Sequence, residues 1–331
     1  MGLIGSAAPV QGASRTNELT QTPGVSSPGH PLPPSRRRKP WWRSRGAKLF
    51  LALGLPGVAM YALGVMIPLG LAVRYSVSDI NLLNGLGDFV GVQNYIDVLT
   101  DPEFWGAFGF TMILTVGSVV VANGVGVTLA VILNKSRRSF HVLRSITFIP
   151  SVLAGVVVAF IWSTILTDRG TLNVLLGNLG LASLQTSWLG SQLGAQVSVI
   201  FVSVWPSIGF GTIIYLAGLQ SVPQELLEAA SVDGASPART FRAITWPLLR
   251  PALFVTSTMM VIGGFKAYDI SVVLTGGGPA GATDTPAFQI LRHGFNENRA
   301  GYANAEAIIL LLVLVIVALV SVALNNRGEK S

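Results

Sequence analysis

Long apolar runs separated by short polar segments make up most of the chain from about residue 49 onward. A helix needs roughly 20 mostly apolar residues to cross a hydrocarbon core about 30 Å thick. The pattern therefore predicts six transmembrane helices, near residues 49–73, 107–133, 142–166, 194–219, 252–275 and 304–324. The predicted fold class is an all-α membrane protein with a membrane domain over residues 48–325.

Proline and glycine inside the apolar runs predict where the helices bend and where they touch. Pro56 and Pro68 in the first run, Pro150 in the third and Pro206 in the fourth should kink or interrupt those helices. Small residues let membrane helices approach closely where no water drives them together. They occur in the second and fourth runs, at Gly117, Gly124, Gly126, Gly209, Gly211 and Gly218.

Composition agrees with a polytopic membrane protein and excludes several other classes. Hydrophobic residues make up 50% of the chain and charged residues 11%, which is unlike a soluble domain of this length. The chain has no cysteine, so it can form neither a disulfide nor a thiolate metal site. Its three histidines, His30, His141 and His293, are too scattered to suggest a metal cluster, and no metal site is expected.

The two ends of the chain differ from the rest in composition. Residues 1–35 are rich in Ser, Pro, Gly and Thr, and a basic run with two tryptophans follows them. Such a composition predicts a disordered tail over residues 1–47, whose basic part suits an anionic leaflet surface. A second short tail is expected over residues 326–331.

The distribution of charge predicts the orientation in the membrane. With the N-terminus inside, nearly all Lys and Arg lie in cytoplasmic segments, whereas the first external loop holds Asp79, Asp88, Asp97, Asp101 and Glu103. The positive-inside rule therefore places both termini in the cytoplasm. The formal net charge of +7 could suggest nucleic-acid binding, but its place beside the apolar runs argues against that function.

The segment between the fourth and fifth runs, residues 221–251, reads as two helices joined at a glycine. Ser221 and Gln224 have the spacing of a capping box, and a helix can continue from there to Val232. Asp233 and Gly234 should end it, because glycine takes the left-handed conformation without a Cβ penalty.

The second helix of this segment should begin at Ser236, with Pro237 at its first position. Pro247 and Pro251 should end it. The predicted orientation places both helices in the cytoplasm, where a partner protein could bind them.

The same segment resembles the EAA loop of the membrane subunits of bacterial ABC importers. Glu228-Ala229-Ala230, then Gly234, then Ile244 and Pro247 follow the family's spacing, although Trp246 stands where the family usually has leucine. In that family the loop is a coupling helix that docks on a separate ATPase subunit. The resemblance assigns ATPase coupling to Glu228, Ala229, Ala230, Asp233, Gly234, Ala235, Ile244 and Pro247.

Other stretches are similar to permeases of the maltose and glycerol-phosphate type. These are residues 90–105, 133–162, 265–285 and 301–307, whereas residues 290–295 depart from the family pattern. The resemblance implies the type I importer membrane fold and the import of a sugar or related polyol across the bacterial cytoplasmic membrane. It also implies a second, homologous permease, two ATP-binding subunits and an extracytoplasmic solute-binding protein as partners.

Energy for such transport would have to come from the partners. The chain contains no G-x-x-x-x-G-K-[ST] motif, so it cannot form a P-loop around ATP phosphates. It also offers no plausible nucleophile and base pair. No cofactor is therefore expected on this chain, and ATP with Mg²⁺ would bind to the ATPase subunits.

Ionisable residues inside a membrane span are costly and point to function by default. Lys266 and Asp269, with Tyr268 between them, should lie on one face of the fifth helix, either as a local ion pair or beside the substrate path. The resemblance adds a cavity wall from the helices on either side of the coupling loop, formed by Ser207, Phe210, Gly263, Gly264 and Ala267.

Two alternatives need weighing against an importer permease. An ion-coupled secondary transporter would want inverted repeats and a network of intramembrane carboxylates, and Asp269 is nearly solitary. A membrane-embedded hydrolase would need a Ser/His or metal constellation inside the spans, which the sequence lacks.

Overall fold

The computed structural model describes residues 45–81, 85, 87–135 and 138–328. The predicted tails, residues 1–47 and 326–331, lie mostly outside this range, and α1 begins at Arg45. The chain divides into two units, residues 1–59 and 60–331. Within the described residues the β pairing is limited to two isolated bridges, so the all-α prediction is confirmed.

The helices follow one another with short connections. The first membrane stretch comprises α1 (Arg45–Tyr61), the π-helical turn η2 (Ala62–Met66) and α2 (Ile67–Ser76). The middle of the chain forms α3 (Gln93–Thr100), α4 (Pro102–Leu133), α5 (Arg138–Val152), α6 (Gly155–Leu166), α7 (Thr171–Asn178), the short η3 (Ala182–Leu184) and α8 (Gln192–Gln220). Then come α9 (Gln224–Val232), α10 (Pro237–Thr240), the π-helical turn η4 (Phe241–Thr245), α11 (Trp246–Phe265), α12 (Asp269–Thr275), α13 (Pro286–Leu291), the π-helical turn η5 (Arg292–Asn296) and α14 (Ala300–Gly328).

Length and apolar composition qualify six helical stretches of the described chain as membrane spans, if one bent pair is counted as a span. Five are continuous: Ala52–Ser76, Pro102–Leu133, Gln192–Gln220, Pro237–Phe265 and Ala300–Ala323. The sixth is the pair Arg138–Val152 and Gly155–Asn178. The order of the predicted spans is therefore confirmed, and their number agrees with six when the bent pair counts as one span.

The third span is broken rather than merely kinked. α5 and the following stretch Gly155–Asn178, which comprises α6 and α7, meet at an angle of 99° across Leu153 and Ala154. Pro150 lies inside α5, so the break comes three residues after the proline that was expected to cause it. By contrast, α8 passes through Pro206 without interruption.

The fifth span lies earlier in the chain than predicted. Pro247 and Pro251 do not end a helix, because α10, η4 and α11 run on as one stretch from Pro237 to Phe265. A π-helical turn just before Pro247 adjusts the backbone where the proline nitrogen cannot donate. The stretch then ends at Phe265, and residues 269–275 form the separate helix α12.

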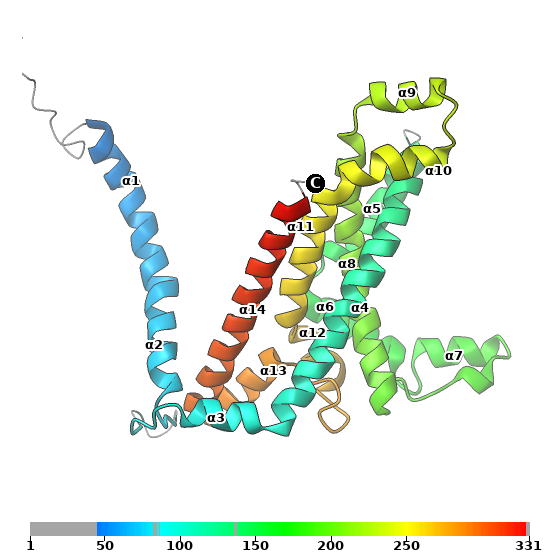
Figure 1. The fold of residues 1–331 in the computed structure, drawn as a ribbon. Helices are drawn as coiled ribbons and strands as arrows, with labels where there is room; N and C mark the ends of the chain where they lie inside the picture. Colours follow the sequence, from blue (N-terminus) through cyan, green and yellow to red (C-terminus); the bar gives the residue numbers. More distant parts are fainter. Residues whose placement is uncertain (1–44, 82–84, 86, 136–137, 329–331) are drawn as a thin grey trace, which may run out of the picture. The chain divides into compact units, whose positions relative to one another are not determined.

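The second unit is held together around α4 and α8, which pack along each other, with α5 and α11 against them (Figure 1). Gly209 of α8 allows α5 to approach closely, since a Cβ there would lie 2.4 Å from the backbone oxygen of Thr147 in α5. One buried cluster joins α4, α6, α8 and α12 through residues such as Leu114, Val158, Val202 and Ile270. These helices frame the site described next.

A buried polar cluster joins α4, α8 and α11 at a level nearer to α9. The hydroxyl of Tyr215 on α8 bonds to Asn123 of α4 and to Thr256 of α11, and Asn123 Nδ2 donates to Ser257 Oγ at 2.8 Å. Buried polar groups are costly unless they are paired, so the cluster favours one register of the three spans.

Candidate functional site

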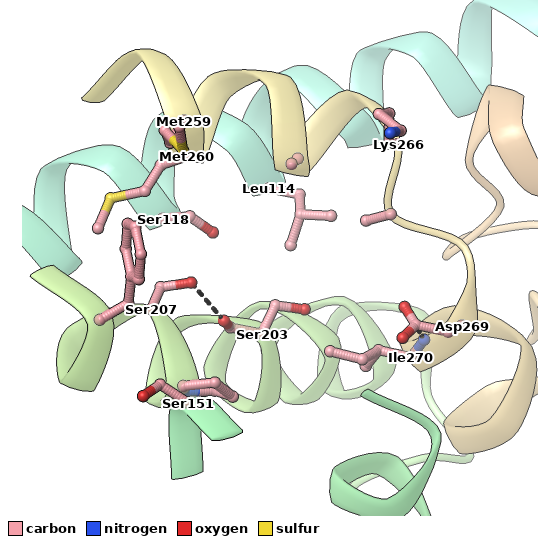
Figure 2. A pocket seen from close by; sticks show the side chains of 15 residues that line it. Leu114, Ser118, Ser151, Ser203, Ser207, Met259, Met260, Lys266, Asp269 and Ile270 are labelled. Carbon is pink, nitrogen blue, oxygen red and sulfur yellow. Dashed lines mark hydrogen bonds between the residues drawn. The ribbon is translucent and has the colours of Figure 1, made fainter. Parts of the chain in front are cut away.

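A cavity of about 430 Å³ lies where α4, α5, α8, α11 and α12 meet. Hydroxyl groups and small residues form much of its wall, and one ammonium and one carboxylate group stand at one end (Figure 2). The lining residues are Leu114, Ser118, Ser151, Ser203, Pro206, Ser207, Phe210, Met259, Met260, Gly263, Gly264, Lys266, Ala267, Asp269 and Ile270. We call this space the central cavity.

Seven of the eight substrate-path candidates line the central cavity. These are Ser207, Phe210, Gly263, Gly264, Lys266, Ala267 and Asp269. Tyr268 is exposed and is not among the lining residues. The sequence analysis missed Ser118, Ser151 and Ser203, which come from three different helices and carry no local motif. Ser203 and Ser207 share one face of α8, and Ser207 Oγ donates to the Ser203 carbonyl oxygen at 3.0 Å.

The predicted helical pairing of Lys266 with Asp269 is wrong. Lys266 caps the end of α11, whereas Asp269 is the first residue of α12, so a helix break separates them. The two side chains do not share a helical face, and no ion pair joins them within the described residues. Figure 2 shows them on separate elements at the same end of the central cavity.

Asp269 instead contacts the break in the third span. A Cβ built on Gly155 would lie 1.8 Å from Asp269 Oδ2, so the carboxylate lies directly against the first residue of α6. Ala154, which precedes α6, supplies no side-chain cap. A carboxylate beside a helix N-terminus is stabilised by the unpaired amides there, typically by about 0.3–1 kcal/mol. Asp269 thus connects α12 to the broken span on the cavity wall.

Gly155→Ala is expected to lower the thermal stability of the protein. The added methyl group must displace the Asp269 carboxylate from α6, and the loss of about 1 kcal/mol should lower Tm by a few degrees. Gly263→Ala is the matched control, because a Cβ at Gly263 meets nothing within 4 Å in the same cavity. Equal melting temperatures for the wild type and Gly155→Ala in detergent solution would show that the contact between Asp269 and Gly155 does not stabilise the fold.

The predicted helix, glycine and helix order of residues 221–251 is present. α9 ends at Val232, Gly234 has φ +71°, and Ser236 Oγ accepts a bond from Arg239 N at 3.4 Å to begin α10. α9 stands largely apart from the other helices, beyond the ends of α4 and α8 (Figure 1). Its outer surface is therefore open to a partner.

Two details of this segment differ from the prediction. Ser221 ends α8, and its Oγ donates to the Gly218 carbonyl oxygen at 2.8 Å, so the capping box with Gln224 does not form. α9 begins after Pro223 without a side-chain cap. The acidic residue in its first turn is Glu225, whereas Glu228 follows in the middle of the helix.

The residues assigned to ATPase coupling lie at the surface. Glu228, Ala229, Asp233, Gly234 and Pro247 are exposed, and Ala230, Ala235 and Ile244 are half-buried. Ala230, Asp233, Ala235 and Ile244 line a hollow of about 220 Å³ between α9 and α10. Arg239 and Thr240 also line this hollow, so its wall offers groups of both charge signs to another protein.

An ion-pair network lies at the end of the second unit opposite α9 (Figure 1). The sequence analysis missed it. Arg292 lies 2.6 Å from Asp284, 3.6 Å from Glu103 and 3.7 Å from Glu297, measured between nitrogen and carboxylate oxygen. Burial raises the pKa of Asp284 despite the opposing charge of Arg292. Arg292 and Glu297 lie at the two ends of η5 and Asp284 precedes α13, whereas Glu103 on α4 is brought to them only by the fold. The network attaches the loop after α12 to the start of α4.

Sequence comparison places the chain in a described family. Residues 122–330 match the family of binding-protein-dependent transport system inner membrane components. The multiple sugar-binding transport system permease protein MsmF of Streptococcus mutans is 36% identical over 242 residues, which are 73% of this chain and 83% of that protein. The trehalose/maltose transport system permease protein MalF of Thermococcus litoralis is 37% identical over 229 residues, 69% of this chain and 76% of that one.

Structural comparison shows the same fold. A chain of a bacterial alginate ABC transporter, solved with an alginate pentasaccharide-bound periplasmic protein, matches with a TM-score of 0.76 at 22% identity. The match covers 88% of this chain and 99% of that chain. Nothing in these comparisons supports the ion-coupled alternative. The chain belongs to the family of binding-protein-dependent transport system inner membrane components and is a permease subunit of an ABC importer, with the type I importer membrane fold.

Proposed function

We propose that this permease carries a sugar or related polyol through the central cavity. The observation that carries the proposal is the cavity wall itself, where four serines, a carboxylate and an ammonium group stand among apolar residues. A hydroxyl-rich ligand needs donors and acceptors in an otherwise apolar passage, and this wall supplies both. The names of two relatives, the multiple sugar-binding permease MsmF and the trehalose/maltose permease MalF, support the same substrate class.

We further propose that α9 and α10 couple the spans to an ATPase subunit. The support is geometric: α9 stands largely apart from the other helices, and α10 continues without interruption into α11, which lines the cavity. A push on α9 and α10 would therefore act on a continuous helical stretch that ends at Phe265 and lines the cavity through Gly263 and Gly264. Closure of two ATPase subunits could in this way reorient the cavity walls.

The proposed assembly follows from these two roles. The chain pairs with a second, homologous permease, two ATP-binding subunits and an extracytoplasmic solute-binding protein, with both termini in the cytoplasm. ATP and Mg²⁺ bind to the ATPase subunits and none to this chain. This orientation places α9 in the cytoplasm, and the Arg292 network and α7 on the outer side.

The proposal is tested by transport with purified components. The permease is reconstituted in liposomes with its partners, and uptake is measured for the ligand found on the cognate binding protein. We expect accumulation of a sugar that requires ATP hydrolysis and the binding protein. Uptake driven by an ion gradient without the ATPase subunits would overturn the proposal.

A further inference from the structure

The connection between α6 and α8, residues 167–191, forms an ordered hairpin around one buried side chain. Asn173 Nδ2 donates to the carbonyl oxygens of Asp168 at 3.1 Å and Thr186 at 2.9 Å, and its Oδ1 accepts from Trp188 Nε1 at 2.9 Å. Gln185 Nε2 donates to the Asn173 carbonyl oxygen at 2.7 Å. These bonds join the two arms of the hairpin, so its surface has a defined shape.

That surface exposes several large apolar side chains. Val174, Leu175, Leu179, Leu181 and Leu184 are all exposed, Leu179 to 64% and Leu184 to 55%. Single exposed leucines are ordinary in proteins, but a group of them in one short hairpin indicates a surface that is covered by something apolar.

Beyond Asp168 and Arg169 at its start, the hairpin carries no charge. Residues 170–191 contain no Asp, Glu, Lys, Arg or His, and their polar residues are Ser, Thr, Asn and Gln. The first loop at the same end of the molecule holds Asp79, Asp88, Asp97 and Asp101 instead. A surface that faced water would be expected to carry charge like that loop. Leucines mixed with uncharged polar groups fit the boundary between lipid headgroups and acyl chains.

The position of the hairpin agrees with such a boundary. It lies at the end of the second unit opposite α9, and α7 runs across the direction of α4 and α8 (Figure 1). Its apolar surface follows directly in the chain from α6, where Val157, Phe160 and Ile161 are exposed. A hairpin that continues from a helix with such an exposed apolar surface would remain at the level where that surface meets its apolar surroundings.

We propose that the hairpin of residues 167–191 lies in the headgroup layer of the membrane, with its exposed leucines and Val174 directed toward the acyl chains. Contact with lipid follows from the hairpin alone, and only its assignment to the outer leaflet rests on the proposed orientation. In this position the hairpin anchors the outer end of the broken third span. The anchored end includes α6, whose first residue contacts Asp269 at the central cavity.

The natural absence of cysteine makes a direct test possible. Single cysteines replace Leu175, Leu179 and Leu184 and carry a nitroxide spin label, with Gln93→Cys on exposed α3 as the water-facing control. The full transporter is reconstituted in liposomes of phosphatidylethanolamine and phosphatidylglycerol, and variants that retain uptake are used. Collision rates are measured with oxygen, which concentrates in lipid, and with a neutral nickel chelate, which stays in water.

We expect oxygen collisions to exceed nickel collisions at all three hairpin positions, and the reverse at Gln93→Cys. Nickel access at the hairpin positions would overturn the proposal, since it would place the leucines in water. Low access to both reagents would also overturn it and would indicate cover by protein, such as the second permease. Labelling of the unmodified transporter with a lipid-soluble diazirine should modify residues 174–184. A lack of modification would also overturn the proposal. Neither readout requires that the substrate be a sugar.

Discussion

Glu228→Lys is expected to abolish ATP-driven uptake while the permease still inserts in the membrane at normal levels. Glu228 is exposed in the middle of α9 and forms no ion pair within the described residues, so its replacement breaks no ion pair of the fold. Reversal of the charge would place like charges together wherever a basic group of the ATPase meets α9. Uptake and ATP hydrolysis are measured on the reconstituted complex.

A second variant and a control separate docking from folding. Gly234→Asp should also uncouple transport, because φ +71° at that position costs a residue with a Cβ roughly 1–2 kcal/mol and would distort the joint between α9 and α10. Glu225→Lys, one turn before Glu228, changes the same charge and should lose less activity, although it gives up a favourable helix-dipole interaction. Wild-type uptake by both Glu228→Lys and Gly234→Asp, at equal protein levels, would remove this segment from the mechanism.

Gly263→Phe is expected to block uptake by filling the central cavity. A Cβ at Gly263 meets nothing within 4 Å, and the residue lines a cavity of about 430 Å³, so a large side chain there would take up space inside the cavity. The variant should assemble normally and lose most of its sugar uptake, because the passage is occupied. Uptake is measured at a saturating concentration of binding protein that carries its substrate.

Two matched variants test whether filled space causes the loss. Gly263→Ala adds only a methyl group and should keep uptake within about twofold of the wild type. Gly124→Phe places the same ring on α4 at another position with open space, outside the lining of the central cavity. Normal uptake by Gly263→Phe would mean that substrate does not pass through this space.

The features predicted well from the sequence depend on local composition. Span number and order follow from the length of apolar runs, since each run must cover the hydrocarbon core by itself. The turn at Gly234 was predictable because a left-handed residue after a short helix leaves glycine as the favoured choice. Seven of the fifteen cavity-lining residues were also found. The family resemblance indicated Ser207, Phe210, Gly263, Gly264 and Ala267, and charge inside an apolar run indicated Lys266 and Asp269.

The features that were missed depend on contacts between distant segments. Nothing near Gly155 indicates that Asp269 lies against it, and nothing near Arg292 indicates that Glu103 is a partner. The end of the fifth span was misplaced because residues 266–268 interrupt the helix without proline or glycine. Pro247 and Pro251 were expected to end a helix, yet a π-helical turn lets the backbone continue.

Site-specific cross-linking from α9 tests the central claim most directly. Val232 is 88% exposed on α9, and cysteine at this position can carry a photoreactive cross-linker in a chain that is otherwise free of cysteine. In inside-out membrane vesicles that contain the whole transporter, we predict an adduct of the permease with the ATP-binding subunit, whose yield changes when ATP is added. Absence of that adduct, together with labelling of Val232→Cys by an impermeant thiol reagent from the external side, would contradict the account.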